Sequence, residues 1–311
     1  MDKMKQRIMY SHAREHDAGI SLLDYMARTF SRLDSESWRR EIEAGAIKVN
    51  EQPGECRMLL KQHDCIAYYP GERSEPEAAA DYTIVHEDKH ILVVDKPANL
   101  CVHPSGPFYR NTLWHMLGLK YGEVHFVNRL DKETSGLMVV ALDKRTAAMM
   151  DNRCCPMCKE YLALVYGNFH GTIRARGHLE ADTGSAIPKK KRFVREDVMP
   201  VSPESADTEL KEERPIGADM TLVRAMPHTG RQHQIRATLF SLGFPMVGDK
   251  LYGPDELLYL KVPNQSFTKE DMAALRMGRQ ALHSAKLTFQ HPWNYEVIRC
   301  EAPLPKDFIT E

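Results

Sequence analysis

The sequence predicts an α+β protein in which a large sheet domain follows a small N-terminal α+β module. Three observations support this prediction. Short apolar strands alternate with helices from residue 82 onward. Residues 20–70 show two short helical segments and then strand-like segments. Residues 70–81 (PGERSEPEAAAD) lack hydrophobic periodicity and combine Pro, Gly, Ser and acidic residues, which is typical of a linker. We therefore expect an N-terminal domain over residues 1–75, a boundary near residue 76, and a second domain over residues 82–311.

The N-terminal module is predicted to begin with two helices. Apolar residues have helical spacing at 21–30 (SLLDYMARTF), and a second helix is expected at 35–45 (SESWRREIEAG), capped by Ser35. Two strands should follow, at 46–50 (AIKVN) and 64–69 (DCIAYY).

This module resembles the small RNA-binding domain named after ribosomal protein S-four. The resemblance implies RNA docking, for which Arg39, Arg40 and Lys48 would form a cationic face. Residues 1–70 hold eleven Lys and Arg against eleven Asp and Glu, so a generic α+β appendage is the alternative. The matching residues are Trp38, Ile42, Gly45, Val49 and Asn50, whereas Glu51 and His63 stand where the domain pattern has glycine.

The second domain is predicted from apolar strands that alternate with helices, a mixture typical of α+β proteins with a large sheet. The strands are ILVVD (91–95), GLMVVAL (136–142), YLALVYG (161–167) and ADMTLVRAM (218–226), and the helices are DKRTAAMMDN (143–152) and RQHQIRATLFSLG (231–243).

Composition and charge narrow the class of protein. With 311 residues, of which 42% are hydrophobic, the chain can bury a full core. No apolar run approaches the ~18 residues of a membrane span, and the first residues, MDKMKQRIMY, lack the apolar core of a secretory signal. We therefore expect a cytoplasmic protein without membrane association. The net charge of -1 gives no global electrostatic reason to bind nucleic acid, so such a site must be a local patch.

The seven cysteines indicate reduced thiols, because their number is odd and no secretory signal precedes them. Cys154, Cys155 and Cys158 form the cluster CCPMC, in which a CxxC half-site could bind zinc or an iron-sulfur centre. A closed zinc site needs four ligands, and no second CxxC or spaced His pair follows. We therefore expect no metal here, and interpret the cluster as a helix-to-strand junction opened by Pro156.

One carboxylate stands out. In VNRLDKETSGL (127–137), Asp131 lies between a basic residue and a Thr-Ser-Gly turn, just before an apolar strand. A buried Asp beside an arginine stays ionised at neutral pH, and a turn before a strand can hold it rigidly against a substrate. Asp131 is therefore our candidate nucleophile, although an Asp in such a turn, taken alone, is more often a turn or salt-bridge residue.

The wider pattern resembles a known family. VNRLDKETSGLMVVA is similar to the HRLDxxTSGLL signature of the RluA-type pseudouridine synthases, RNA-modifying isomerases, with Asn128 where the family usually has His. The resemblance implies the pseudouridine synthase fold, a bent, mostly antiparallel sheet with the active-site cleft across its middle. Further motifs occur in the family order and cover most of residues 81–311: ILVVDKPANLCVHPSG (91–106), KEYLALVYG (159–167), HTGRQHQIRATLFSLGFPMVGDKLYG (228–253) and ALHSAKLTFQHP (281–292).

The resemblance assigns roles to two more side chains. Tyr161 is expected to lie against the uracil, where its phenol could transfer a proton; without the flanking motifs it would be a strand aromatic facing the core. Thr229 and Gln232 have capping-box spacing, which places Arg231 in the first turn of a helix. The helix dipole does not favour a basic residue there, which indicates a partner. In the family the matching arginine pairs with the catalytic aspartate, so we expect Arg231 to pair with Asp131, the alternative being a surface arginine.

RNA contacts are expected from residues near the signature and from one charge run. The resemblance places Arg129 to fill the gap that a flipped-out uridine leaves, although it could equally bind a phosphate. Asn128 keeps a hydrogen-bonding side chain in place of the usual ring. A basic run between two predicted strands is either a solvated loop or a set of phosphate contacts beside the cleft, and it comprises Lys189, Lys190, Lys191 and Arg192.

Our main hypothesis is an isomerase acting on uridines of structured RNA, either rRNA or tRNA, with no cofactor and no obligatory protein partner. One alternative is a non-catalytic RNA-binding protein that retains the fold, suggested by Asn128 and the neutral N-terminal module. Another is a glycosidase that uses Asp131 to excise the base. Glycosidases usually employ two carboxylates, whereas only Asp131 lies in a recognisable site, which weighs against this class. The sequence leaves open whether Asp131 attacks the anomeric carbon or assists elimination to a glycal.

Overall fold

The computed structural model describes residues 8–30, 33–71, 75–151, 156–196, 202–263 and 265–308. Helices and sheets combine in an α+β arrangement, as predicted. The chain divides into two compact units, residues 1–76 with 105–109 and residues 77–104 with 110–311.

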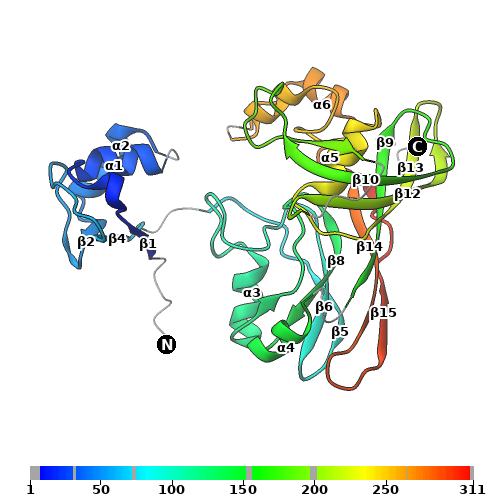
Figure 1. The fold of residues 1–311 in the computed structure, drawn as a ribbon, viewed down its shortest axis with the longest axis horizontal. Coiled ribbons are helices and arrows are strands. Elements are labelled where there is room, and N and C mark those ends of the chain that lie inside the picture. Colours follow the sequence, from blue (N-terminus) through cyan, green and yellow to red (C-terminus); the bar gives the residue numbers. More distant parts are fainter. Residues whose placement is uncertain are drawn as a thin grey trace. The chain divides into compact units, whose positions relative to one another are not determined.

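The first unit packs two helices on a small antiparallel sheet (Figure 1). Its elements are β1 (Met9–His12), η1 (Glu15–Asp17), α1 (Leu22–Thr29), α2 (Ser35–Glu43), β2 (Ile47–Val49), β3 (Gln52–Pro53) and β4 (Cys65–Tyr68), and the strand order is β1-β4-β2-β3. The buried Trp38 centres the core, with its ring 5.2 Å from that of Tyr68. Asp34 caps α2 with its side chain, whereas the predicted cap, Ser35, is the first helical residue.

A sheet of eleven strands forms the frame of the second unit. In spatial order its strands are β11 (Lys191–Arg195), β10 (Thr172–Ala181), β12 (Ser205–Ile216), β13 (Met220–Pro227), β9 (Cys158–Tyr166), β14 (Leu282–Gln290), β8 (Ser135–Ala141), β6 (Ile91–Lys96) and β5 (Thr83–Glu87), with β15 (Val297–Glu301) beside β14 and β7 (His125–Phe126) beside β8. Among the strands described, only β14 and β8 pair in parallel, so the predicted mostly antiparallel sheet is confirmed. In Figure 1, β10 and β12 run across the picture while β6, β8 and β14 run down it.

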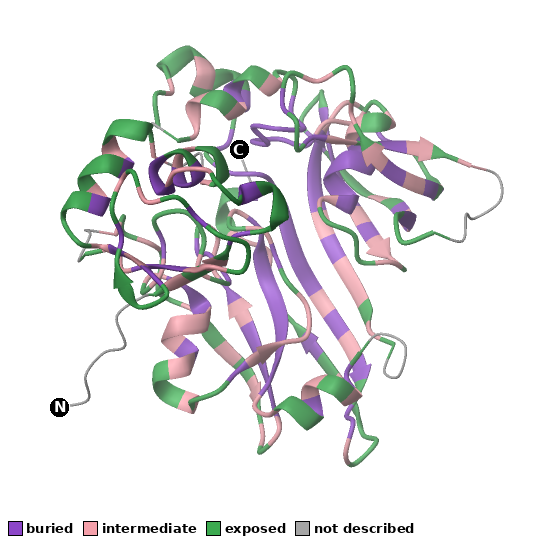
Figure 2. Cartoon of the chain, turned by 60° about the vertical axis from the view of Figure 1, so that its left-hand side comes forward, coloured by how far each residue is buried: buried purple, intermediate pink, exposed green. Residues whose placement is uncertain are grey.

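The central strands β6 and β8 are buried on both faces, as the purple ribbons of Figure 2 show. Met138 and Val140 of β8 pack into one apolar cluster, and Leu137 and Val139 pack into another on the opposite face. Strands covered on both sides read as continuous apolar runs, which explains why these segments were recognisable in the sequence.

Gly136 lets β8 approach β14 closely, shortly after the turn that carries Asp131. Its φ is +106°, and a Cβ at this position would lie 2.3 Å from the carbonyl oxygen of Ser284. No L side chain fits such a gap, so the parallel contact between these strands requires glycine. This contact fixes where the preceding turn lies in the sheet.

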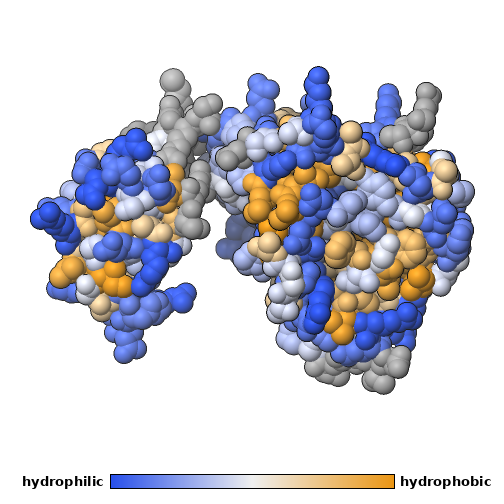
Figure 3. Space-filling view, turned by 90° about the horizontal axis from the view of Figure 1, so that it is seen from above, coloured by the Kyte–Doolittle hydropathy of each residue, from blue (hydrophilic) through white to orange (hydrophobic). Residues whose placement is uncertain are grey.

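Short helices flank the sheet, among them α5 (Gln234–Ser241), which packs against β10, β11 and β13. The helices predicted at 143–152 and 231–243 are present in shorter form as α4 (Lys144–Met149) and α5. No helix in the described ranges is long and apolar enough to cross a membrane. In Figure 3, hydrophobic side chains lie in separate patches among hydrophilic ones. The helical elements of this unit are α3 (Leu113–Tyr121), α4 (Lys144–Met149), α5 (Gln234–Ser241), η2 (Glu256–Lys261), α6 (Lys269–Leu275) and η3 (Lys306–Phe308).

The cysteine cluster is only partly covered by the structure. Cys154 and Cys155 lie outside the described residues, and Cys158 is exposed at the start of β9. Across the parts of the chain that are described, no group of three or more His, Cys, Asp or Glu side chains is arranged to hold a metal ion.

Candidate active site

Asp131 lies in the tight turn that leads into β8. The backbone N–H of Thr134 donates to the carbonyl of Asp131 across this turn, at 3.2 Å. The side chain of Asp131 is 34% exposed, so its carboxylate can be reached from outside. The turn therefore presents one carboxylate just before the start of β8.

The buried Lys96, at the end of β6, ties this turn to the neighbouring strand. Its Nζ donates to the carbonyl oxygens of Pro97 at 2.8 Å, Leu100 at 3.0 Å and Lys132 at 3.1 Å. Burial lowers the pKa of Lys96 to about 7, although Cys101 and Asp131 act in the opposite direction. Three acceptors match the three N–H groups of the ammonium form, so the amine acts as a clamp on the backbone.

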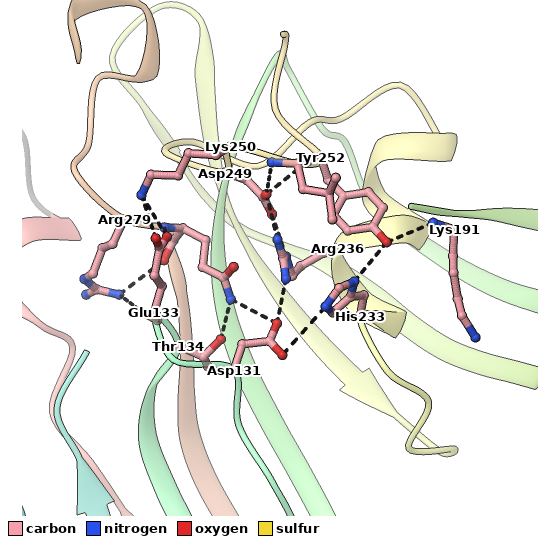
Figure 4. Close-up of polar contacts among 12 residues, drawn as sticks. Asp131, Glu133, Thr134, Lys191, His233, Arg236, Asp249, Lys250, Tyr252 and Arg279 are labelled. Atoms are coloured by element: carbon pink, nitrogen blue, oxygen red, sulfur yellow. Dashed lines mark hydrogen bonds and ion pairs between the residues drawn. The ribbon is translucent and has the colours of Figure 1, made fainter. Parts of the chain in front are cut away.

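The charge partner of Asp131 is Arg236 of α5 (Figure 4). Its Nη1 donates to Oδ2 of Asp131 at 2.7 Å, while Nε and Nη2 donate to the two oxygens of Asp249 at 2.6 and 2.8 Å. Asp249 is fully buried and also accepts the backbone N–H groups of Leu251 and Tyr252, both at 2.9 Å. The two-pronged bond to Asp249 fixes the plane of the guanidinium, so its remaining nitrogen, Nη1, points at Asp131.

These contacts keep Asp131 ionised. Burial by itself raises the pKa of the Asp131 carboxyl, but the Arg236 guanidinium and smaller contributions from His233 and Gln280 outweigh it, so the pKa lies below its ordinary value. The pKa of Asp249 is lowered by the same opposition of burial and Arg236. The pKa of Arg236 is raised, because two carboxylates overcome its burial.

A second set of contacts holds the turn and one oxygen of the carboxylate. Gln280 donates from Nε2 to Oδ2 of Asp131 at 3.3 Å and to the hydroxyl of Thr134 at 2.6 Å. The backbone N–H of Gln280 donates to Glu133, whose two oxygens also accept from Lys250, each at 2.9 Å. Both direct partners of the carboxylate thus bind Oδ2, and within the described residues no donor lies in hydrogen-bond distance of Oδ1.

His233 is the group that faces Oδ1, with Nε2 at 4.0 Å. It precedes α5 with a left-handed φ of 58°, and its Nδ1 lies 3.1 Å from the hydroxyl of Tyr252. Burial and the charge of Arg236 lower the pKa of His233 to about 4, although Asp131 acts to raise it. The imidazole is therefore neutral at physiological pH.

Tyr161 lies on β9, close enough to Asp131 to feel its charge. Its side chain belongs to the main apolar cluster and is only 8% exposed. Burial raises the pKa of Tyr161 to about 12, an effect that the Ser284 hydroxyl reduces and Asp131 adds to. The phenol is therefore protonated at neutral pH.

The predicted pairing of Arg231 with Asp131 is wrong, because the helix begins later than its spacing indicated. Gln234, not Gln232, closes the turn: its Oε1 accepts from the Thr229 hydroxyl at 2.8 Å and from the Arg231 backbone N–H at 3.0 Å. Arg231 consequently precedes α5, and its Nε donates to the carbonyl of Ser205 at 3.0 Å. The arginine that reaches Asp131 lies five positions further along the chain.

The two signature residues before Asp131 face different surroundings. Arg129 is exposed, as an RNA contact requires. Asn128 instead turns its amide inward, where Oδ1 accepts from the backbone N–H of Val139 at 2.8 Å and Nδ2 is buried. Its side chain supports β8, and an RNA contact from this residue stays a prediction.

The basic run near residue 190 borders a hollow of about 620 Å³ between β10, β11 and Gln232. The expectation of four phosphate contacts is wrong for Lys190, which is buried and donates to Glu256 at 2.7 Å. Lys189 is exposed, and no carboxylate among the described residues lies within ion-pair distance of it. Two further members belong to strand β11 rather than a loop, and each pairs with a carboxylate: Lys191 with Glu204 at 3.1 Å, and Arg192 with Glu180 at 2.6 Å.

In the first unit, the three predicted phosphate contacts lie on α2 and the adjacent β2. Arg39 is exposed and 3.5 Å from Glu36, and Arg40 is exposed and donates to the Ser37 hydroxyl at 3.2 Å. Lys48 lies over the ring of Tyr69, 5.1 Å from its centroid.

Sequence reasoning missed Arg236, Asp249 and Gln280. The first two lie in the segment 228–253 that was recognised as a motif, but its two arginines compete for the same role until the helix start is known. Gln280 directly precedes the recognised segment 281–292, and nothing in its neighbourhood distinguishes it.

Comparisons with known proteins identify what the chain is similar to. Residues 90–241 match the family model described as RNA pseudouridylate synthase. The chain is 31% identical to the ribosomal large subunit pseudouridine synthase D of Neisseria meningitidis, over 89% of this chain and 73% of the relative. It is 30% identical to the mitochondrial tRNA pseudouridine(32) synthase of Saccharomyces cerevisiae, over 76% of this chain and 51% of the relative. The solved structure of human RNA pseudouridylate synthase domain containing 1 shares the fold, with a TM-score of 0.55 and 24% identity over 74% of this chain and 86% of that one.

Proposed function

Because this chain belongs to the RNA pseudouridylate synthase family, whose members are isomerases acting on RNA, we propose that it converts specific uridines of rRNA or tRNA to pseudouridine with Asp131 as the nucleophile. The environment of Asp131 is the observation that supports this role most directly. The carboxylate is ionised and partly exposed, with Oδ2 engaged by Arg236 and Gln280 and Oδ1 directed away from both.

The reaction sets the tasks that the site must perform. The bond from ribose C1′ to N1 of uracil breaks, the base turns, and C1′ joins C5, which loses its proton while N1 gains one. Product and substrate are isomers of equal oxidation state, so the balance requires no cofactor. Asp131 serves either by attacking C1′ or by removing the proton from C2′ to give a glycal, and Oδ1 is the oxygen with a free path in both cases.

Tyr161 is proposed to lie against the freed uracil. Its phenol is protonated at neutral pH, because burial raises its pKa to about 12. It therefore donates a hydrogen bond or a proton and does not begin as a base. A flat, rigid ring beside Asp131 also limits how far the cleaved base can move.

RNA is proposed to bind on both units. In the second unit, Arg129 is exposed beside Asp131, and Lys189 stands at the basic hollow without a carboxylate partner among the residues described. In the first unit, Arg39, Arg40 and Lys48 present cationic groups for phosphates. The choice between rRNA and tRNA follows the relatives, which are named for either class.

The test is a position-by-position map of pseudouridine in total RNA from cells that lack this protein and are restored with the parent or with Asp131→Asn. Asparagine keeps the shape of the side chain but removes its charge, so we expect the sites to return only with the parent. Asp219→Asn is the matched control, because Asp219 also pairs with an arginine, Arg276, but does so on the surface. Sites restored by Asp131→Asn would overturn the role of Asp131. A map that the protein does not change would favour RNA binding without catalysis.

A further inference from the structure

Oδ1 of Asp131, which has no hydrogen-bond partner among the described residues, faces the imidazole of His233. Oδ1 of Asp131 and Nε2 of His233 are 4.0 Å apart, too far for a direct hydrogen bond. A single oxygen atom placed about 2.8 Å from each would contact both, since such a triangle closes at this separation. Figure 4 shows the two side chains directed toward one another.

Tyr252 contacts the other ring nitrogen of His233 and so bears on which nitrogen carries the proton. The Tyr252 hydroxyl accepts the backbone N–H of Lys191 at 3.1 Å and lies 3.1 Å from Nδ1 of His233. A hydroxyl that accepts from Lys191 can direct its own hydrogen to Nδ1, and this arrangement would leave the imidazole proton on Nε2. The ionised carboxylate of Asp131 favours the same assignment, because it attracts an N–H and repels a lone pair.

The same framework that holds Asp131 also holds this donor in place. The rings of His233 and Tyr252 meet edge to face at 5.5 Å, and the guanidinium of Arg236 lies over the Tyr252 ring at 5.0 Å. The backbone N–H of Tyr252 is bound by Asp249, which also orients Arg236. The donor and the acceptor are therefore fixed relative to one another before any substrate arrives.

We infer that Nε2–H of His233 and Oδ1 of Asp131 form a subsite for the 2′-hydroxyl of the target uridine, which accepts from the imidazole and donates to the carboxylate. The inference rests on the proposed action of Asp131 at ribose. A hydroxyl is the group that both accepts and donates through one oxygen. Inside an RNA chain the 3′ and 5′ oxygens are esterified and O4′ is in the ring, so the 2′-hydroxyl is the one ribose hydroxyl available. Its carbon is bonded to C1′, where Asp131 acts.

Two consequences follow for recognition. The 2′-hydroxyl distinguishes RNA from DNA, so this subsite selects the nucleic acid at the reacting nucleotide itself. The hydrogen bond also orients the ribose, which makes His233 a specificity-determining residue and Tyr252 a positioning residue that acts through it.

The tautomer can be tested without RNA. In nitrogen-15 spectra of the full chain with labelled histidine, we expect the His233 signals, assigned by their loss in His233→Asn, to show a neutral ring protonated on Nε2. In Tyr252→Phe, which retains the ring but lacks the hydroxyl, the signals should move toward a mixture of tautomers. A ring protonated on Nδ1 in the parent would overturn the inference.

The subsite itself is tested by a cycle of protein and substrate changes under single-turnover conditions. The probe is a synthetic stem-loop that carries the uridine found by the cellular map, with ribose or 2′-deoxyribose at that one nucleotide. We expect the deoxy change to slow the parent about 10- to 100-fold, the range for a lost hydrogen bond to a charged group. In Tyr252→Phe and in His233→Asn the same change should cost less than about threefold, because the donor is misplaced or absent.

The variants are chosen to preserve the backbone and the packing. Asparagine tolerates the left-handed φ of His233, and Tyr166→Phe is a matched control that removes a tyrosine hydroxyl bonded to the carbonyl of Ala274 at 2.9 Å. Tyr166→Phe should behave as the parent on both stem-loops. An equal deoxy penalty in the parent, Tyr252→Phe and His233→Asn would refute the subsite while leaving Asp131 intact. Activity of Asp131→Asn would instead refute the proposed function.

Discussion

Replacing Arg236 with lysine separates the charge of this residue from its shape. The lysine keeps one positive charge between Asp131 and Asp249 but lacks the planar fork that reaches both carboxylates. A single ammonium cannot reproduce the three bonds that Arg236 makes, two to Asp249 and one to Asp131. At least one carboxylate should therefore lose its partner.

The size of the expected effect on stability follows from the burial of these ion pairs. Each hydrogen bond to a charged group contributes about 1.5–3 kcal/mol, and breaking a buried pair by removing one partner costs about 3–5 kcal/mol. Because lysine retains the charge, we expect Arg236→Lys to lower the free energy of unfolding by about 3 kcal/mol, at the low end of that range. Loss of the donor that orients Asp131 should slow the single-turnover rate at neutral pH on the order of 10²-fold.

The pH dependence of the single-turnover rate gives a sharper test of how Arg236 controls the ionisation of Asp131. In the parent, the pKa of Asp131 lies below its ordinary value because Arg236 overcomes burial, so the carboxylate stays ionised as the solution becomes acidic. With a weaker partner, burial prevails and the pKa of Asp131 rises. The loss of activity on acidification should therefore begin at a higher pH in Arg236→Lys than in the parent, measured by single-turnover rates on the stem-loop probe.

The matched control is Arg276→Lys, which alters a two-pronged pair with Asp219 on the surface. Solvent screens exposed pairs, so urea unfolding and the rate profile should both match the parent. An Arg236→Lys protein with parental stability and an unshifted acid limb would refute the argument that this arginine controls the ionisation of Asp131.

Three further substitutions test the frame of the site and its RNA contacts. Gly136→Ala should lower the thermal midpoint by the equivalent of more than about 2 kcal/mol, because the new methyl would meet the Ser284 carbonyl, and a parental midpoint would contradict this. Lys96→Met should reduce the single-turnover rate strongly, because it releases three carbonyl groups that fix the turn. The free energy of unfolding should change less, because the substitution also removes a buried charge, and circular dichroism checks the fold. Lys189→Gln should weaken RNA binding and reduce by about one the slope of the logarithm of the binding constant against the logarithm of salt concentration. The control Lys191→Gln should change both quantities less, since Glu204 already neutralises Lys191. Equal effects of the two substitutions in titrations at several salt concentrations would contradict this.

The elements that could be predicted are those whose signal is local. The segments 91–95 and 136–142 were recognised as strands because burial on both faces leaves unbroken apolar runs. The N-cap of α2 was misplaced by one residue, since Asp34 and Ser35 are both good caps and only the backbone decides between them. The order of the strands has no local signal, because β14 reaches β8 and β9 from more than a hundred residues away in sequence.

The site, too, contains residues that a local motif predicts and residues that only the tertiary fold brings in. Asp131 could be proposed from its motif, but Arg236 and Gln280 reach it across 105 and 149 positions, and only the packed sheet brings them together. The basic run illustrates the opposite error. Lys190 has the same type of side chain as Lys189, but its backbone turns it inward, where Glu256 and the Phe240 ring receive it. A run of basic residues in a sequence therefore indicates an RNA-binding surface only once it is known which of them pair with carboxylates.

The partition of donors on Arg236 explains why Oδ1 of Asp131 has no donor within hydrogen-bond distance among the residues described. A guanidinium that bound Asp131 with two prongs would engage both carboxylate oxygens. Here Asp249, held by two backbone N–H groups, takes the two-pronged contact instead. Asp131 receives one guanidinium donor on Oδ2, together with the amide of Gln280, and the pKa of Asp131 stays below its ordinary value although burial opposes this. Asp249, which the substrate need not touch, thus determines which oxygen of Asp131 remains available for chemistry.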